Sequence, residues 1–283
     1  MTFSPRTDLA VECVSGRTVS HGITQTVRGK TFHITEILIE NDEDAKTVGK
    51  PKGRYVTLET SSLNGFGGDY RKMIEELADE LRKFIPEGHI MVAGLGNSGI
   101  TPDALGVYAA EGVIATRHLK SEFADDEFFG NLRSVSVLIS GVIGKTGIET
   151  AEIIRSVAER IKPDALIAID ALACADMSRL GRTIQISDTG ISPGSGVQNR
   201  RKELSYSTLG IPVIAIGVPT VMDMYTIIEN FTGNKADSDI PNMMVTPKDI
   251  DKLTEHSAEI ISYALNCALQ PDLSFEDIGE MQR

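Results

Sequence analysis

The sequence predicts a three-layer α/β/α sandwich around a mostly parallel sheet, with a small β-rich segment added near its N-terminus. The first observation is that short apolar runs alternate with helical patterns from Ile90 onward, which is typical of buried parallel strands and their connecting helices. The second is that apolar residues alternate with polar ones at 23–27 and 32–39, around Arg28-Gly29-Lys30, which indicates a hairpin.

The individual elements follow from the same patterns in chain order. Residues 54–60 add a third strand to the hairpin, and about 19–60 form the β-rich subregion. Asp69 is expected to cap a helix that carries Met73, Leu77 and Leu81 on one face. Further strands are expected near 90–95, 113–117, 134–140, 164–169, 183–187 and 212–217, and helices near 102–112, 147–161, 220–231 and 248–269.

Composition excludes several classes of protein. The net charge of −12 argues against a nucleic-acid-binding surface, which needs a clustered basic face. No apolar run is long enough to span a membrane, and the first residues do not form a signal peptide. The three cysteines lack the spacing of a zinc site or a disulfide framework. We therefore expect a cytoplasmic protein without direct nucleic-acid or membrane contact.

Two aspartates stand where a catalytic site is expected. Asp103 follows the apolar run 90–95, and Asp170 follows the apolar run 165–169. In a parallel sheet the ligand crevice lies beyond the carboxyl ends of the strands, so the two carboxylates can face one cleft. Such a pair shares a proton and can activate water against an amide. Each aspartate alone also fits a structural role, as a helix-start or turn residue.

A dinucleotide-binding motif competes with this interpretation. Residues 94–99 read Gly-Leu-Gly-Asn-Ser-Gly after an expected strand, which matches G-x-G-x-x-G. A true fingerprint would place Pro102 inside the following helix, whereas Thr101 as N-cap with Pro102 at the first helical position is more natural. The next strand ends at Arg117, where an NAD site needs an acidic residue, although an NADP site can use arginine. An oxidoreductase therefore stays open as an alternative.

Other motifs do not reach the spacing that their chemistry requires. Gly144-Lys145-Thr146 resembles the end of a P-loop, but Ile139 stands where that loop needs glycine. The histidines show no metal-ligand spacing, so no metal site and no cofactor are predicted. Ser195 lies between two glycines but lacks the outer glycines of a nucleophile elbow.

Long segments of the chain resemble the germination protease (spore protease) family. The resemblance rests on Gly94-Leu95-Gly96-Asn97 with Thr101-Pro102-Asp103-Ala104-Leu105-Gly106, on Ile169-Asp170-Ala171-Leu172-Ala173, and on the stretches 184–197 and 209–221. Residues 6–12, 53–59 and 146–150 extend it over nearly the whole chain. The resemblance implies an endopeptidase of atypical aspartic type that degrades small acid-soluble spore proteins at germination, in the spore core.

The resemblance also implies an assembly and a site. The fold is expected to be similar to that of the hydrogenase maturation proteases, and the protein to be a homotetrameric zymogen. The family's two functional aspartates match Asp103 and Asp170, and its processing point maps between Asp8 and Leu9. Residues 1–8 then form a propeptide-like segment before a single domain at 9–283. Bacillus-type members carry an insertion where this chain has a short polar stretch at 233–242.

The expected mechanism assigns each aspartate a role. Asp103 stands at a helix N-terminus, which lowers a carboxyl pKa, so it is expected to be the base and Asp170 the acid. Backbone N–H groups of Gly96 and Asn97, or of Gly194 and Gly196, are candidates to stabilise the oxyanion. A metal-dependent maturation peptidase is a second alternative beside the oxidoreductase.

Overall fold

The computed structural model describes residues 7–14, 22–61, 63, 70–123, 126–193, 202–234 and 241–282. Its strands are β1 (Ile23–Arg28), β2 (His33–Ile39), β3 (Gly53–Glu59), β4 (Ile90–Gly94), β5 (Val135–Ile139), β6 (Ala165–Cys174), β7 (Thr183–Ser187), β8 (Val213–Asp223) and β9 (Met244–Val245). Its helices are α1 (Ala10–Val14), α2 (Asp42–Val48), α3 (Tyr70–Arg82), the 3-10 helix η1 (Thr101–Asp103), α4 (Leu105–Glu111), α5 (Arg117–Glu122), α6 (Glu127–Asn131), α7 (Ile143–Thr146), α8 (Thr150–Ile161), α9 (Tyr206–Leu209), α10 (Met224–Thr232), α11 (Ile250–Leu269) and α12 (Phe275–Met281).

One sheet connects all the strands of the described residues. Its order is β1-β2-β3-β7-β8-β6-β4-β5, and β9 pairs with the far end of β8. The strands β8, β6, β4 and β5 are parallel and form the expected doubly wound centre. The N-terminal strands are antiparallel and join this centre through β3 and β7, which pair with each other. The β-rich segment is thus an extension of the main sheet, and the expected α/β fold is confirmed.

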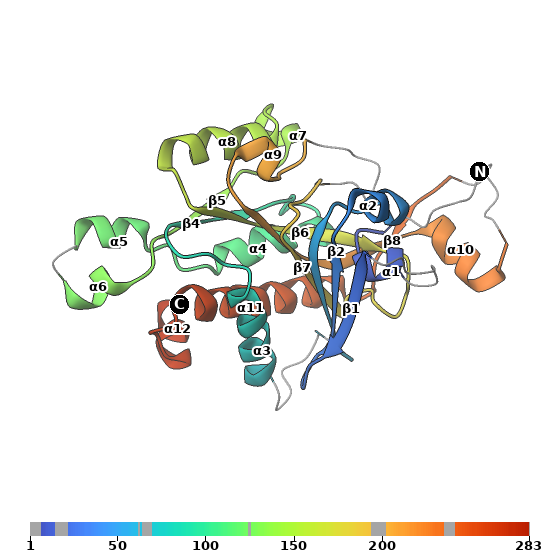
Figure 1. The fold of residues 1–283 in the computed structure, drawn as a ribbon, viewed down its shortest axis with the longest axis horizontal. Coiled ribbons are helices and arrows are strands. Elements are labelled where there is room, and N and C mark those ends of the chain that lie inside the picture. The colour runs from blue at the N-terminus through green and yellow to red at the C-terminus, as the bar shows by residue number, and fades with distance from the viewer. Residues whose placement is uncertain are drawn as a thin grey trace.

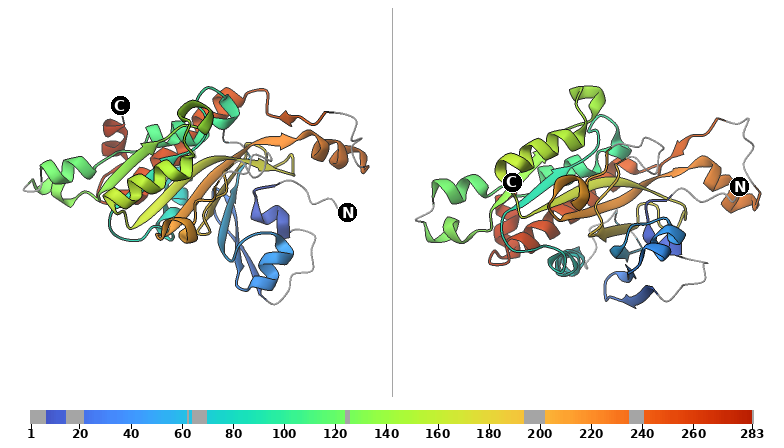
Figure 2. Two further views of the ribbon diagram at one scale, coloured as in Figure 1. Left: turned by 90° about the horizontal axis from the view of Figure 1, so that it is seen from above. Right: turned by 45° about the horizontal axis from the view of Figure 1, so that its top comes forward.

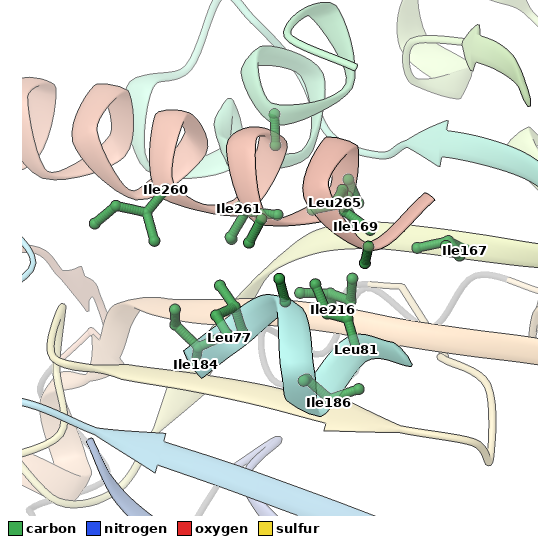
Figure 3. Packing of buried hydrophobic residues seen from close by; sticks show 14 of the residues in the cluster. Leu77, Leu81, Ile167, Ile169, Ile184, Ile186, Ile216, Ile260, Ile261 and Leu265 are labelled. Carbon is green, nitrogen blue, oxygen red and sulfur yellow. The ribbon is translucent and has the colours of Figure 1, made fainter. Parts of the chain in front are cut away.

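Helices cover both faces of the sheet (Figure 1). On one face α3, α4 and α11 pack against the isoleucines of β6, β7 and β8. Figure 3 shows Ile260, Ile261 and Leu265 of α11 directed at Leu77 and Leu81 of α3 and at the sheet. Burying one aliphatic side chain of this size stabilises a fold by about 1.5–3 kcal/mol, so this cluster is the main source of stability.

The opposite face is covered by two separate groups of helices. Helices α8 and α9 pack over β4 and β6. Helices α1 and α2 pack over β2, β3 and the far ends of β6 and β8. Figure 2 shows these two groups well apart, with the blue α1 and α2 beside the N-terminal strands and the green α8 at some distance. Among the described helices, none covers the strip of the sheet between the two groups. Among the described residues, no helix is both long and apolar enough to cross a membrane.

The expected strand at 113–117 is wrong. Residues 113–116 form an irregular connection, and α5 begins at Arg117. The Ile114 N–H, which a strand would use in its ladder, instead donates to Asn266 Oδ1 of α11 at 3.0 Å. This apolar run is thus a connecting segment that the Asn266 side chain holds in place. It showed no feature that distinguishes it from a short strand.

Two strands are longer than their apolar runs predict. β6 continues to Cys174 and β8 to Asp223 because the two strands keep pairing with each other beyond the ends of their neighbours. The helix expected at 220–231 consequently begins at Met224, with Asp223 Oδ1 accepting the Tyr225 N–H as its N-cap. Other boundaries differ by a few residues, and the predicted cap Asp69 lies outside the described residues.

One carboxylate fixes the tip of the β1–β2 hairpin to α3. Glu76 accepts the backbone N–H groups of Lys30, Thr31 and Phe32 at 2.7, 2.7 and 3.0 Å. Partial burial acts to raise the pKa of this carboxyl, but the three N–H donors outweigh burial and lower the pKa below its ordinary value of 4.5. The ionised form is therefore bound more tightly in the folded chain than in the unfolded one.

We predict that Glu76→Gln lowers the free energy of unfolding at pH 7 by about 1 kcal/mol, since charge-assisted hydrogen bonds are lost at a partly solvated site. Because the folded-state pKa is lowered, this contribution is present above pH 4.5 and disappears as the pH falls through the folded value. Urea denaturation at pH 7 and pH 3 checks both statements. Glu75→Gln, which removes an exposed contact to Arg71 on the same helix, should be nearly neutral.

Candidate active site

Asp170 lies inside β6, at the level where the neighbouring strand β4 stops. Gly94, the last residue of β4, is paired with Ile169, and Leu95 N–H donates to Ile169 O at 2.9 Å. Asp170 is thus the first residue of β6 beyond β4, although β6 itself continues to Cys174. The prediction that Asp170 follows a strand is corrected to this position. The crevice expected at the strand ends is formed by the shorter β4.

Asp170 belongs to a row of residues that crosses three strands. Asp170 is paired with Gly217 of β8, and Gly217 is paired with Gln185 of β7. Residues paired in this way point to the same face, so the side chains of Gln185 and Asp170 flank a position without a side chain. Two strand spacings separate their Cα atoms by about 10 Å. A Cβ at Gly217 would lie 2.6 Å from Leu172 Cγ, so the gap depends on glycine.

Asp103 is held beside the loop that follows β4. It is the last residue of η1, and its carbonyl oxygen accepts the Asn97 N–H at 2.9 Å. A Cβ at Gly96 would lie 2.0 Å from that oxygen and 3.4 Å from Asp103 Cγ. Gly96 has φ +101°, a conformation that favours glycine. The Asp103 carboxyl group therefore lies close to Gly96. Gly96 directly follows Leu95, whose N–H binds the carbonyl oxygen of Ile169, the residue before Asp170.

Two threonines that the sequence analysis did not identify hold η1 in place through their hydroxyl groups. Thr220 Oγ1 donates to Pro102 O at 2.7 Å, and Thr254 Oγ1 lies 3.4 Å from Thr101 O. Thr220 is the extra residue of a β-bulge, since Leu172 pairs with Pro219 and Ala173 pairs with Val221. A bulge turns a side chain away from its regular direction, which allows the buried Thr220 hydroxyl to reach η1.

The predicted cap geometry before α4 is wrong. Ile100 is the N-cap of η1, with Pro102 in its first turn, and Ala104 precedes α4. The chain makes a separate 3-10 turn at 101–103, which holds Asp103 before the α-helix begins. Because α4 starts only at Leu105, the glycines of 94–99 do not open a helix as a dinucleotide fingerprint requires. Among the described residues, no group of three or more His, Cys, Asp or Glu side chains is arranged to hold a metal ion.

A cavity of about 410 Å³ lies over the uncovered strip of the sheet. Asp170, Gly217 and Gln185 line it, together with Lys50 and Asp8. Asp170 is 4% exposed, and its Oδ1 accepts the Ala171 N–H at 2.9 Å. Tyr55 also lines the cavity; burial raises the pKa of its phenol above the usual range, and its hydroxyl donates to Pro51 O at 2.8 Å. Tyr55 is therefore an uncharged residue of the cavity lining.

The predicted processing point enters the same cavity. Asp8 lines it, and Asp8 N–H donates to Ala173 O at 2.9 Å. Leu9 is 0% exposed and packs in the cluster of α1, β2 and the end of β6. The sequence analysis did not predict that Asp8 and Asp170 line one cavity. This proximity arises because the extended part of β6 pairs with the N-terminal segment.

The predicted oxyanion donors have different positions. Gly96 and Asn97 lie beside Asp103, and the Asn97 N–H is already used by Asp103 O. This contact favours a positioning role for the Gly96-Asn97 pair. Gly194 and Gly196 lie outside the described residues.

The chain is similar to known proteins of one family. The family model described as germination protease matches residues 14–232. The germination protease of Clostridium tetani is 40% identical over 321 aligned residues, covering 98% of this chain and 99% of that protein. That of Caldanaerobacter subterraneus subsp. tengcongensis is 39% identical over 317, covering 98% and 97%. That of Priestia megaterium is 36% identical over 364, covering 98% and 96%.

The fold and these matches define a peptidase built on a mixed α/β sheet. The chain belongs to the germination protease family. Its relatives align over more positions than the 283 residues of this chain, so they contain segments that it lacks.

We predict that Gly96→Ala lowers kcat for protein hydrolysis by about 100-fold, because the new Cβ displaces Asp103 O and a misplacement of about 1 Å is costly to catalysis. The measurement is peptidase activity alongside a thermal melt. Gly144→Ala in α7 is the matched control, since its Cβ meets nothing within 4 Å. Equal activities of the two variants would show that Asp103 does not need its present position.

Proposed function

We propose that the chain is an endopeptidase of atypical aspartic type that hydrolyses small acid-soluble spore proteins during germination in the spore core. The supporting observation is that Asp170 lies at the level where β4 ends and that Asp103 lies beside the loop that follows β4, held there through the Asn97 N–H. Asp170 lines the cavity, whereas Asp103 is not among its lining residues. The family match supports the spore protein as substrate, and the cavity beside Asp170 provides room for a peptide.

In the proposed mechanism Asp103 and Asp170 share one proton. The ionised aspartate accepts a proton from water as the water oxygen attacks the carbonyl carbon of the substrate. The protonated aspartate donates to the leaving nitrogen as the C–N bond breaks. We retain Asp103 as base and Asp170 as acid, with the pair titrating as one unit. No cofactor takes part in this proposal.

We further propose that the chain is a zymogen which removes its own residues 1–8. The supporting observation is that Asp8 and Asp170 line one cavity, so the bond to Leu9 is near the proposed catalytic group. Residues 9–283 then form a single domain, since the N-terminal strands share the main sheet.

We predict that Asp103→Asn and Asp170→Asn each reduce hydrolysis of a small acid-soluble spore protein by at least about 1,000-fold, because an amide can neither accept nor supply the shuttled proton. The same variants should keep the full N-terminus, whereas the active wild-type chain should begin at Leu9. Gel assays and N-terminal sequencing make these measurements, and circular dichroism checks that the fold persists.

Asp176→Asn serves as the matched control, since this aspartate follows the same strand but lies outside the cavity and contacts Ser178. The Asp176→Asn variant should hydrolyse the spore protein at the wild-type rate. Assays with and without a chelator test the metal-dependent alternative. Wild-type activity in both aspartate variants, or activity that is lost with chelator and restored by a divalent ion, would refute the aspartic mechanism.

We also propose that the protein assembles as a homotetramer in which β1 contributes to subunit contacts. β1 lies at the end of the strand order of the described sheet, and Val27 is 57% exposed there. An open edge of this kind can pair with another chain unless it is covered.

We predict a particle of four chains by light scattering at micromolar concentration. Val27→Lys should shift the population to smaller particles, because a charge on an edge strand opposes pairing. Ile148→Lys, at an exposed apolar residue between α7 and α8, should keep the wild-type mass if β1 is the interface. A wild-type monomer would contradict the proposed assembly.

A further inference from the structure

The carbonyl oxygen of Asp8 is held by two side chains from distant parts of the chain. Lys50 Nζ donates to Asp8 O at 2.8 Å, and Gln185 Nε2 donates to the same oxygen at 3.0 Å. Donors at 2.7–3.1 Å from the oxygen that becomes negative are the geometry of an oxyanion hole. One of the two donors is a cation, which strengthens the interaction as negative charge develops.

Gln185 binds the backbone on both sides of Leu9. Its Nε2 donates to Asp8 O, while its Oε1 accepts the Ala10 N–H at 2.7 Å. The side chain is 8% exposed and extends from the middle of β7, so its orientation is fixed by packing. This amide therefore defines where the carbonyl at residue 8 must lie relative to the sheet.

Lys50 is positioned by the end of α2. Gly49 takes a left-handed conformation with φ +77°, and both Gly49 N–H and Lys50 N–H return to Ala45 O, at 2.8 and 3.2 Å. This helix end directs Lys50 into the cavity, where its ammonium group also lies 3.4 Å from Thr7 O.

The residue before the bond is recognised as well. The Asp8 carboxylate accepts the Ala173 N–H at 2.8 Å, while Asp8 N–H donates to Ala173 O. Residues Leu9 and Ala10 are both 0% exposed. The site thus holds an acidic residue, an apolar residue and alanine in succession.

The bound carbonyl lies over the row that contains Asp170. Gln185 and Asp170 flank Gly217, and both line the cavity with Asp8 and Lys50. The loop after β4 has few donors left for this task, since Leu95 N–H, Asn97 N–H and Gly99 N–H bind Ile169 O, Asp103 O and Asn97 Oδ1. Lys50 and Gln185, by contrast, already donate to a peptide carbonyl inside the cavity.

We propose that Lys50 and Gln185 are catalytic residues that bind the carbonyl oxygen of the bond to be cut, and that the Asp8–Leu9 bond occupies the substrate position. This inference rests on the proposed function and adds to it the group that stabilises the oxyanion. It also assigns the backbone of Ala173 as the binding point for an acidic side chain before the cut.

The chemistry balances with the groups present. The water oxygen bonds to the Asp8 carbonyl carbon, and the aspartate pair accepts the proton of that water. The π electrons move onto Asp8 O, where Lys50 and Gln185 stabilise the negative charge. The C–N bond to Leu9 then breaks as a proton from the aspartate pair reaches the Leu9 nitrogen. The products are a carboxylic acid at Asp8 and a free amine at Leu9.

The test follows release of residues 1–8 from the full wild-type chain and its variants by mass spectrometry. We predict that Lys50→Ala slows release by about 100-fold or more, the loss typical of one oxyanion donor. Added ethylamine should restore part of the rate, because its ammonium group fits the space left in the cavity. Lys50→Arg should retain at least about a tenth of the rate. Gln185→Glu, which keeps the acceptor for Ala10 N–H but loses the donor, should be slowed comparably.

Lys52→Ala is the matched control, since Lys52 lies two residues away and pairs with Asp42 on the surface. It should release the segment at the wild-type rate. A Lys50→Ala chain that processes normally overturns the proposal. So does a slow Lys50→Ala chain that neither ethylamine nor the arginine variant restores, since that result marks a structural role.

Two further measurements separate this proposal from the proposed function. A wild-type chain that cleaves spore protein but acquires an N-terminus other than Leu9 overturns the carbonyl assignment and leaves the peptidase function intact. Conversely, Asp103→Asn and Asp170→Asn chains that process at the wild-type rate refute the aspartate pair. In that case an amine-restored Lys50→Ala chain would still support the oxyanion role.

Discussion

The site depends on the hydrogen bond from Leu95 N–H to Ile169 O, where β4 ends against β6. This bond determines which residue of β6 is the first without a strand neighbour on that side, and that residue is Asp170. The same bond starts the loop through Gly96 and Asn97 that holds Asp103. A shift of one residue in this register would turn the Asp170 side chain to the other face of the sheet, under α4 and α11. The hydrophobic cluster that packs those helices on β6 therefore also protects the geometry of the site.

The layered fold could be predicted because its signal is local. The buried central strands are continuous apolar runs, and α11 and α3 repeat apolar residues at helical spacing. The far halves of β6 and β8 cannot be predicted, because no contrast in hydrophobicity marks the point where β4 stops. The irregular connection at 113–116 cannot be distinguished from a strand in the sequence, because the deciding contact comes from Asn266, far along the chain. Long-range partners of this kind leave no periodic trace.

The candidate site likewise contains residues that the sequence predicts and residues that it does not. Asp103 and Asp170 could be singled out because acidic residues after buried strands suggest function, and a family resemblance supported them. Lys50 and Gln185 could not, since an exposed-looking lysine after a short helix and a glutamine in an alternating strand are common in any sheet protein. Only the antiparallel β3–β7 pairing brings the N-terminal layer, and with it Lys50, to the row of Asp170.

The two sides of the Asp8–Leu9 bond are anchored by different forces. Thr7 and Asp8 are held by hydrogen bonds to Lys50, Gln185 and Ala173. Leu9, Ala10 and Val11 bury their side chains in an apolar cluster, to which Ala10 adds one hydrogen bond to Gln185. In the processing that we propose, the leaving piece gives up polar contacts that water replaces at little net free energy, while the retained piece keeps its buried surface. The cut is then effectively irreversible, because the released peptide is diluted into solvent. The new chain end stays bound at the edge of the vacated cavity.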